Sequence, residues 1–537
     1  MSATGFSSST ISVWSPLRYR IFRAMWIAIT ASNIGTWMNE VGVTWMMANL
    51  SASNLLVALI QTATTLPFLL FSYPSGTLAD LFNRRRMLLV LHVWMLLSAT
   101  ALTLLTFQGL TTEWWLLALT FALATGNAMM RPAFSACIPA FVPKNELPQA
   151  ITLNSLSTNA SKAIGPALGG LIIAMTGPYV VFALNALSFI VILTILYLRF
   201  PHTLGHESRL PAENFLRALK GGIDYTLHDR EFLVVLARCV AFFVFASAFW
   251  SLMPALLIRE FSASAESYGA LMALTGIGAV SGAMVMPRLY ARWSRNALFG
   301  ITTVLYGLGL LALAAAQSLF VAGAIAVVMG LAWITGFSSL IVACQLTVPD
   351  WVRARALAIV MLSYGASATP SSAFWGYLAD KVGISTGLAV AGAGTLATLL
   401  LSAWLPLSSR DRDHTRAEIP AAIGPHNIDR NAGLVTLSRT YRVAEENREA
   451  FHTAMQQIRA LCKRNGAHSW QLAEDEPGVF TEVVTVQSGL DYLRQLERVT
   501  ADDDRLMRQA IALSVAANQP IISQSDNRAP HKQPAGL

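Results

Sequence analysis

The chain has 537 residues, of which 54% are hydrophobic and 13% are charged, and its mean hydropathy is +0.50. Soluble domains usually carry about 25% charged residues, so this composition excludes an ordinary soluble protein and indicates an integral membrane protein. The formal net charge is +8, but the basic residues are scattered between apolar segments, which argues against nucleic acid as a partner. Four cysteines, far apart and without CxxC spacing, indicate neither a zinc site nor a disulfide framework.

Twelve apolar stretches of about 20 residues, the length that crosses a bilayer as a helix, follow one another. They cover residues 24–48, 55–78, 87–107, 114–137, 150–174, 179–198, 231–257, 268–289, 297–315, 319–343, 355–378 and 386–405. The first stretch is too long and too polar for a cleavable signal. We therefore expect an all-α membrane protein with twelve transmembrane helices.

The basic residues of the connections predict the orientation. The connections after even-numbered stretches hold Arg84, Arg85, Arg86, Lys144, Arg292, Arg295, Arg353 and Arg355. The longer connection after the sixth stretch adds Arg199, Arg209, Arg217, Lys220 and Arg230. The opposite side has little more than Arg259 and Lys381. Because positively charged loops stay in the cytoplasm, both termini and the long connection are predicted to be cytoplasmic.

An internal repeat relates the two parts of the helical region. Residues 142–170 can be laid on residues 348–376 with an offset of 206 residues, and the same offset places Gly76 on Gly282 and Arg86 on Arg292. A shared offset at two separate turns predicts two six-helix halves with the same orientation, which is the parallel repeat of one large transporter fold.

The turn after the second stretch, GTLADLFNRRR at residues 76–86, resembles the G-x-L-x-D-x-x-G-R-R signature of the major facilitator superfamily. Asn83 replaces the usual second glycine, and we expect it to adopt the left-handed backbone that glycine would supply. Residues 32–37, 153–170 and 348–356 resemble the branch that includes enterobactin exporters and transmembrane secretion effectors. The resemblance covers essentially the whole chain and implies proton-coupled export of a siderophore, drug or small metabolite.

One face of the first stretch carries Asn33, Trp37, Glu40 and Thr44 at helical spacing. A charge at the bilayer centre costs about 2.5 to 3.5 kcal/mol, so an ionisable residue there is a candidate for function. Glu40 is the candidate proton-coupling site. The alternative is a carboxylate that reaches the outer interface or is satisfied by Asn39.

Other polar and aromatic side chains in the stretches are candidates for a substrate cavity. Lys162 and Arg238 provide one cation in each half, and each could attract an anionic substrate such as a catecholate, balance Glu40, or form a structural pair. The complete set of cavity candidates is Asn33, Trp37, Gln61, Thr65, Asn127, Asn154, Thr158, Lys162, Arg238 and Trp333.

The resemblance also implies a cytoplasmic gate. In the superfamily, the signature Asp links the two halves through an Arg of the fourth helix and the positive N-terminal end of the eleventh. The gating candidates here are Gly76, Asp80, Arg84, Arg85 and Arg131, with lipid anchoring as the alternative for Arg84 and Arg85. Gly165, Pro166, Gly169 and Gly170 resemble the end of the antiporter motif, although close helix packing explains them equally well.

After the helical region, runs at residues 434–443, 445–464, 469–472, 479–486 and 490–498 follow in the order strand, helix, strand, strand, helix. This order predicts a small cytoplasmic α+β ferredoxin-like domain. The domain resembles antibiotic-biosynthesis-monooxygenase-like domains, which often dimerise, and so implies a homodimer. His468, Trp470 and Glu482 are candidates for an enzymatic site, but no nucleophile triad, metal spacing or phosphate loop accompanies them, so no enzyme is expected.

These interpretations assign every part of the chain. The predicted regions are a cytoplasmic N-terminus at 1–23, the N-terminal half at 24–198, a cytoplasmic connection at 199–230, the C-terminal half at 231–407, a linker at 408–432, the ferredoxin-like domain at 433–515 and a disordered tail at 516–537. We expect a multi-pass transporter of the bacterial cytoplasmic membrane, with a small-molecule substrate, protons and membrane lipid as partners and no cofactor or metal. The alternatives are a membrane ligand sensor with a regulatory domain and a transporter fused to a small enzyme.

Overall fold

A computed structural model describes residues 14–81, 83–135, 137–138, 141–143, 146–199, 228–408, 433–517 and 521–524. The chain divides into two compact units. The first comprises residues 1–209, 238–340 and 361–406, and the second comprises 210–237, 341–360 and 407–537. The first unit is helical, whereas the second includes an α+β domain, here called the C-terminal domain, at residues 433–517 and 521–524.

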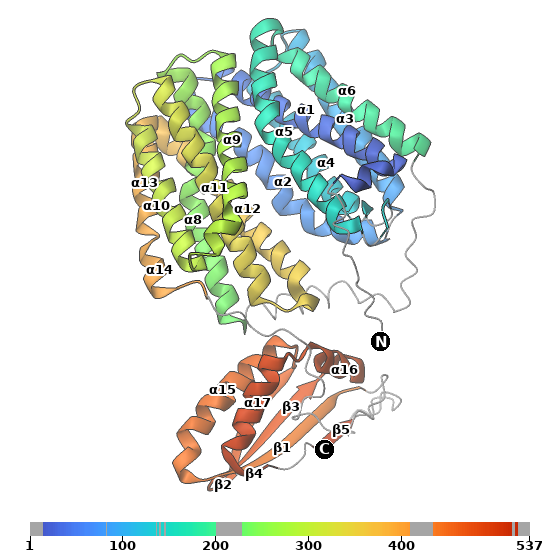
Figure 1. Cartoon of the computed structure of the whole chain (residues 1–537), viewed down its shortest axis with the longest axis vertical. Coiled ribbons are helices and arrows are strands. Elements are labelled where there is room, and N and C mark those ends of the chain that lie inside the picture. The colour runs from blue at the N-terminus through green and yellow to red at the C-terminus, as the bar shows by residue number, and fades with distance from the viewer. Residues whose placement is uncertain are drawn as a thin grey trace, which may run out of the picture. The chain divides into compact units, whose positions relative to one another are not determined.

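Long helices form most of the described part of the chain before residue 408 (Figure 1). Their bounds are α1 Arg20–Leu50, α2 Asn54–Leu81, α3 Arg84–Phe107, α4 Glu113–Ser135, α5 Leu147–Thr176, α6 Pro178–Arg199, α8 Arg230–Ala255, α9 Ala265–Tyr290, α10 Arg295–Ala314, α11 Leu319–Thr347, α12 Asp350–Val382, α13 Ile384–Ala397 and α14 Leu400–Trp404. The short helix η1 Ser15–Arg18 precedes α1, and the π-helical turn η4 Leu256–Glu260 follows α8. The starts of α4 and α11, at Glu113 and Leu319, are 206 residues apart, which is the predicted repeat offset.

Eight of the described helical segments are long and apolar enough to cross a membrane. The long helices α1, α4, α5 and α12 fall outside this set, since polar and charged side chains such as Glu40, Arg131 and Lys162 interrupt their apolar sequence. The helices that carry Glu40, Arg131 and Lys162 are therefore not recognised by hydropathy alone, whereas α8, which carries Arg238, is recognised.

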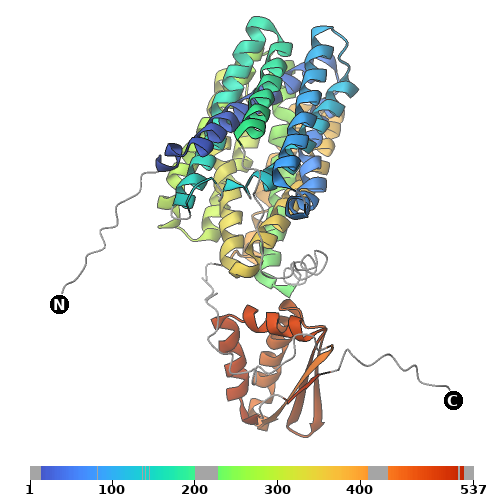
Figure 2. The ribbon, with the colours of Figure 1, turned by 90° about the vertical axis from the view of Figure 1, so that its right-hand side faces the viewer.

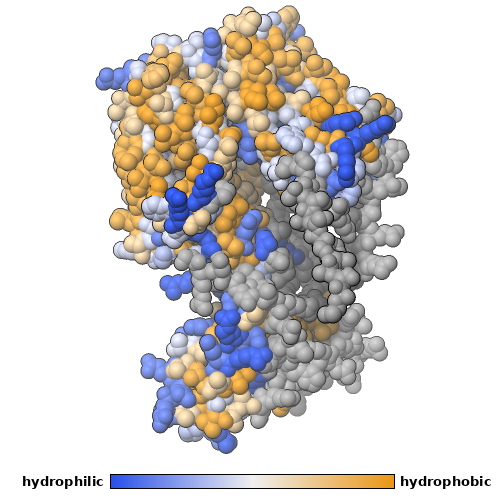
Figure 3. Space-filling model, in the orientation of Figure 1, coloured by the Kyte–Doolittle hydropathy of each residue, from blue (hydrophilic) through white to orange (hydrophobic). Residues whose placement is uncertain are grey.

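Apolar side chains cover much of the outer surface of the helical unit (Figure 3). Phe320, Met284 and Trp114 are 88%, 71% and 70% exposed. Large exposed apolar surfaces of this kind are unfavourable in water and are expected where helices face lipid.

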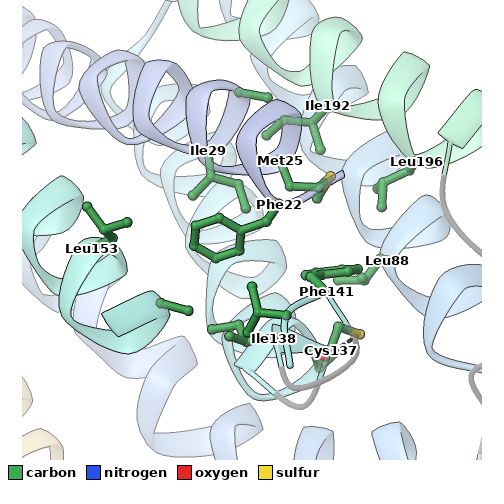
Figure 4. Packing of buried hydrophobic residues seen from close by; sticks show 14 residues of the cluster. Phe22, Met25, Ile29, Leu88, Cys137, Ile138, Phe141, Leu153, Ile192 and Leu196 are labelled. Carbon is green, nitrogen blue, oxygen red and sulfur yellow. Dashed lines mark hydrogen bonds between the residues drawn. The ribbon is translucent and has the colours of Figure 1, made fainter. Parts of the chain in front are cut away.

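A buried cluster holds the start of α1 against its neighbours (Figure 4). Phe22, Met25 and Ile29 of α1 pack with Leu88 of α3 and with Leu196 of α6. Beside this cluster, Glu146 is 1% exposed and accepts hydrogen bonds from the Ser15 hydroxyl at 2.9 Å, the Tyr19 hydroxyl at 3.0 Å and the Arg18 guanidinium. The first residues of the described chain thus supply the hydrogen bonds that compensate the burial of this carboxylate.

Asn83 corrects one expectation. Its φ is −61°, so the predicted left-handed backbone is wrong. Asn83 is instead the N-cap of α3, and its side-chain oxygen accepts from the backbone N–H groups of Arg85 at 3.0 Å and Arg86 at 3.3 Å. Asparagine is favoured here because its short side chain satisfies N–H groups that have no partner within the helix.

The predicted single helix at residues 386–405 is divided into α13 and α14. At the junction, the Thr398 hydroxyl donates to the carbonyl of Thr395 at 2.6 Å, and the Thr398 N–H contacts the carbonyls of both Gly394 and Thr395. Such local bonds compete with regular α-helical pairing and explain the break.

The C-terminal domain is an antiparallel sheet with helices on one face (Figure 2). Its elements are β1 Val435–Val443, η5 Glu445–Asn447, α15 Arg448–Arg464, β2 Ser469–Glu476, β3 Val479–Val486, α16 Gly489–Arg498, α17 Ala501–Ala512, β4 Ser514–Ala517 and β5 Ile521–Gln524. The sheet order is β2-β3-β1-β4, and β5 also pairs with β1. The prediction of disorder from residue 516 is therefore wrong for the part that forms β4 and β5, because β1 offers these short segments backbone pairing.

We expect Asn83→Ala to destabilise the start of α3 by about 0.5 to 2 kcal/mol, since two backbone N–H groups lose their acceptor. Hydrogen exchange at the amides of Arg85 and Arg86 should accelerate accordingly. Asn83→Ser, which preserves a capping oxygen, is the control and should retain most of the protection. Equal exchange in the alanine, serine and parent proteins would contradict the capping role.

Candidate functional site

Three charged side chains from three helices act on one another electrostatically: Glu40 of α1 and Lys162 of α5, which are half-buried, and Arg131 of α4, which is exposed. The Lys162 Nζ lies 5.8 Å from the centre of the Trp37 ring, and the Arg131 Cζ lies 5.3 Å from that of Phe68. Among the described residues, no basic side chain lies within 4.0 Å of the Glu40 carboxylate. Glu40 therefore has cations nearby without being locked in a direct ion pair.

Small residues on α5 bring Lys162 close to α1. A Cβ atom added at Gly165 would lie 2.5 Å from the Trp37 Cβ, and one added at Gly169 would lie 3.0 Å from the Met38 Cα. Both distances are shorter than normal contacts, so the two helices can approach this closely only with glycine at these positions. The packing explanation of this glycine motif is thus supported, and it places Lys162 one turn away, beside Trp37.

Two tyrosines that were not predicted complete the surroundings of Glu40. The charge of Glu40 acts on the hydroxyl groups of Tyr268 in α9 and Tyr364 in α12. The Tyr268 ring stacks on Trp45 at a centroid distance of 6.5 Å. Glu40 of α1 is therefore within electrostatic range of hydroxyl groups on α9 and α12.

Trp333 of α11, a predicted cavity residue, belongs to an aromatic cluster of the second half. Its ring lies 5.2 Å from Phe243, 5.5 Å from Trp250 and 6.2 Å from Tyr364, measured between centroids. The Trp250 Nε1 is buried and has no hydrogen-bond partner within the described part of the chain. Tyr364 thus connects this cluster with Glu40, and Trp250 offers an unused donor within it.

Three other cavity candidates, Thr65, Asn127 and Thr158, donate hydrogen bonds to backbone carbonyls of their own helices. The Thr65 hydroxyl contacts the carbonyl of Gln61 at 2.8 Å, and the Asn127 amide donates to Leu123 at 3.3 Å. The Thr158 hydroxyl donates to the carbonyl of Asn154 at 3.0 Å. Asn33 is half-buried on α1, on the face that carries Trp37 and Glu40.

Arg238 lies apart from the charged cluster. It is 2% exposed, its Cζ lies 5.0 Å from the centre of the Phe299 ring, and its Nη1 donates to the Leu405 carbonyl at 3.4 Å. These contacts bind α8 to α10 and to the end of α14. A structural role therefore fits its surroundings better than substrate binding.

The gating candidates are only partly described. Gly76 and Asp80 belong to α2 and Arg84 begins α3, but their side chains lie outside the described part of the structure. Arg85 donates through Nε to the carbonyl of Leu196 at 3.1 Å and through Nη2 to that of Tyr197 at 2.7 Å. This guanidinium therefore caps the C-terminal end of α6, a role that favours a cation and that the sequence did not reveal.

A second set of contacts, which we call the Asp380 clamp, joins α12 and η4 to residues 51–55 before and at the start of α2. The Asp380 carboxylate accepts from the Asn54 N–H at 2.6 Å, the Ser53 hydroxyl at 2.7 Å and the Leu55 N–H at 3.2 Å. Arg259 donates to the Ser51 carbonyl at 2.7 Å and to the Asn54 side chain. An anion is favoured at a helix N-terminus, so the clamp stabilises the contact of α12 and η4 with the start of α2.

The clamp continues along α2 and α12. The Thr65 hydroxyl lies 2.9 Å from that of Thr369, and the Thr62 hydroxyl donates to the Thr369 carbonyl at 3.1 Å. The sequence showed Arg259 and Lys381 only as sparse charges in loops. Asp380 and its neighbours could not be recognised because their partners lie more than 300 positions away.

The candidate catalytic residues of the C-terminal domain, His468, Trp470 and Glu482, form hydrogen bonds with other side chains of that domain. The Glu482 carboxylate accepts from the Tyr441 hydroxyl and from the Trp470 Nε1, both at 2.8 Å. His468 contacts Gln487 instead, at 3.3 Å. The structure thus brings Trp470 and Glu482 together and places His468 with another residue.

Comparison with known proteins gives concordant results. The family described as transmembrane secretion effector matches residues 11–529. The uncharacterized MFS-type transporter YfiS of Bacillus subtilis (strain 168) is 27% identical over 383 residues, which are 68% of this chain and 88% of YfiS. The staphyloferrin A transporter of Staphylococcus aureus is 24% identical over 366 residues, 68% and 90% of the two chains. The solved nucleoside transporter NupG shares the fold, with a TM-score of 0.59, 11% identity, and 72% and 100% coverage.

We expect Asp380→Leu to weaken the clamp, because it removes the acceptor of three hydrogen bonds, and to disfavour the clamped state by about 1 to 3 kcal/mol. The measurement is an electron paramagnetic resonance distance between spin labels at Ala52 and Val382, both on the surface beside the clamp, with the native cysteines replaced. The population at short distance should fall.

The matched control is Glu266→Leu, which removes an exposed carboxylate at the start of α9 and should leave the distance distribution unchanged. An unaltered distribution in Asp380→Leu would show that the carboxylate does not hold these helices together.

Proposed function

The chain belongs to the transmembrane secretion effector family of major facilitator superfamily transporters, and on this premise we propose that it exchanges protons for a siderophore, drug or small metabolite and exports that substrate by alternating access. The observation that carries the proposal is the cluster of Glu40, Lys162 and Arg131. An ionisable carboxylate within a transporter's helices, near cations but not bound to them, is suited to take up and release a proton.

Glu40 would act as the coupling group. Exchange requires that proton and substrate compete, and a cationic or hydrogen-bond-donating group of the substrate could compete directly for the carboxylate. An anionic group would instead be attracted by Lys162 and Arg131. Tyr268 and Tyr364 would supply hydroxyl groups from the second half, so occupancy of the cluster would be sensed by both halves.

The aromatic cluster around Trp333 would bind the apolar part of the substrate. Aromatic rings provide large contact areas, and the unpaired N–H of Trp250 could orient a polar substituent. Asn33 and Trp37, on the same face of α1 as Glu40, would line the opposite wall.

The Asp380 clamp would be one of two alternating gates. Its contacts join the halves at the end where α2 begins, and they would have to break for this end to open. Asp80 of the family signature and Arg131 of α4 would provide the gate at the other end. Arg131 would then serve both the charged cluster and the gate.

We assign the chain twelve spanning helices in two six-helix halves, with both termini in the cytoplasm of a bacterial cell and the helices in its cytoplasmic membrane. The 206-residue spacing of two pairs of helix starts, α4 with α11 and α6 with α13, and the basic connections support this assignment. The order β1, α15, β2, β3, α16, α17, β4 and the strand arrangement support a ferredoxin-like C-terminal domain. Its edge strand β2 could pair with a second copy in a homodimer.

The proposal predicts that Glu40→Gln slows proton-driven substrate accumulation in inverted membrane vesicles by on the order of 10²-fold. This is the low end of the rate effect that a proton-transferring side chain contributes. The substrate panel should include an anionic siderophore and a cationic drug. Exchange of substrate for substrate without a gradient should persist, because glutamine keeps the size and hydrogen bonding of the side chain.

Glu113→Gln is the matched control, since Glu113 is a carboxylate at the first residue of α4 and away from the cluster. It should transport at the parent rate. Gradient-driven uptake that is equally fast in Glu40→Gln would remove Glu40 from the coupling role, and uptake of no substrate by the parent protein would oppose a transporter of this class.

A further inference from the structure

The C-terminal domain contains a pocket between its sheet and its helices. The pocket has a volume of about 80 Å³, several times the space that one water molecule needs, and it opens to the surface on one side. Strands β1 and β3 form one wall, and α15, α16 and the following residues form the other. Apolar side chains supply most of the lining: Leu437, Ile458, Leu461, Leu496, Val499 and Met507.

Two hydrogen-bond donors on α16 line this pocket and are unused. Tyr492 is 2% exposed, and its hydroxyl has no hydrogen-bond partner within the described residues. The same holds for the buried Nε2 of Gln495. Burial raises the pKa of Tyr492 to about 12, so its hydroxyl is protonated at neutral pH and can donate. Both groups would be satisfied by an oxygen acceptor placed in the pocket.

The charges at the base of the pocket leave room for such an acceptor. Arg439 of β1 lies opposite Glu482 of β3 in the sheet register. Both Glu482 oxygens already accept hydrogen bonds, from Tyr441 and from Trp470, which reduces the repulsion that this carboxylate would exert. The charge of Glu482 acts on Tyr441 more strongly than that of Arg439 does, whereas the charge of Arg439 acts on Tyr492. The Tyr492 end of the pocket, and not the Tyr441 end, therefore favours an oxygen anion.

Tyr492 is difficult to explain by packing alone. A buried hydroxyl without a partner lowers stability, whereas phenylalanine would fill the same space without that cost. A polar group kept in this situation is expected where a ligand supplies the missing bond. The pocket, its apolar walls and its two unused donors therefore indicate the same class of occupant.

We propose that the C-terminal domain binds a small molecule with a ring-sized apolar body and a carboxylate at one end, held by Tyr492, Gln495 and Arg439. The apolar body lies against Leu437, Leu461 and Leu496. This site is formed only by residues of the C-terminal domain and is separate from the residues around Glu40. It does not depend on the proposed direction or coupling of transport.

Equilibrium dialysis with radiolabelled 2-naphthoate tests this site on the full chain in lipid nanodiscs, with empty nanodiscs as the background. The matched probe 2-(aminomethyl)naphthalene has the same ring system and a cationic donor in place of the carboxylate. We expect saturable binding of 2-naphthoate at one site per chain and at least tenfold weaker binding of the amine. Tyr492→Phe and Gln495→Leu should each weaken 2-naphthoate binding about three- to tenfold, as loss of one hydrogen bond does.

Thermal unfolding of the C-terminal domain separates binding from folding. Tyr492→Phe should keep or raise its Tm while binding falls, because the mutation removes an unsatisfied hydroxyl and little volume. Gln471→Leu on the exposed face of β2 is the control for Gln495→Leu and should bind like the parent. No saturable 2-naphthoate binding, equal binding of the amine, or parent-like binding by both pocket variants would overturn the proposal.

Discussion

A charged side chain inside a membrane must be compensated, and this requirement organises the helical unit. Glu40, Lys162 and Arg131 come from three helices, and each charge lies within electrostatic reach of the other two. Isolated charges in a low-dielectric interior are costly, whereas a group of mixed sign shares that cost. The same charges lower the apolarity of α1, α4 and α5, so these helices depend on packing with their neighbours.

Close packing supplies that support. Gly165 and Gly169 allow α5 to approach α1, which brings Lys162 beside Trp37. At the start of α2, the Asp380 carboxylate satisfies backbone N–H groups that the helix itself leaves unpaired. The first set of contacts fixes the geometry of α5 against α1, and the second joins the start of α2 to α12.

Helix positions could be predicted because apolar length and basic connections are local properties. The predicted stretch 150–174, for example, lies within α5 at Leu147–Thr176. The face of α1 that carries Glu40 could also be predicted from periodicity. The partners of that face could not, because Tyr268 and Tyr364 lie more than 200 positions away and periodicity does not specify which helix a face contacts.

The sequence-based prediction was wrong where one residue type can take either of two structural roles. Asn83 can adopt a left-handed backbone or cap a helix, and only the structure distinguishes the two outcomes. The segment after residue 515 was predicted to be disordered, yet β1 provides a template on which β4 and β5 pair. Arg85 was counted as a loop charge, although the carbonyls of α6 that it caps explain its position.

Proton release on substrate binding is the most direct measurement of the coupling assigned to Glu40. The purified protein, in weakly buffered detergent solution with a pH-sensitive dye, is mixed with a substrate that it transports in vesicles. If substrate and proton compete for Glu40, binding should release up to one proton per site from the parent and none from Glu40→Gln. Equal proton release from both proteins would contradict the assignment of coupling to Glu40.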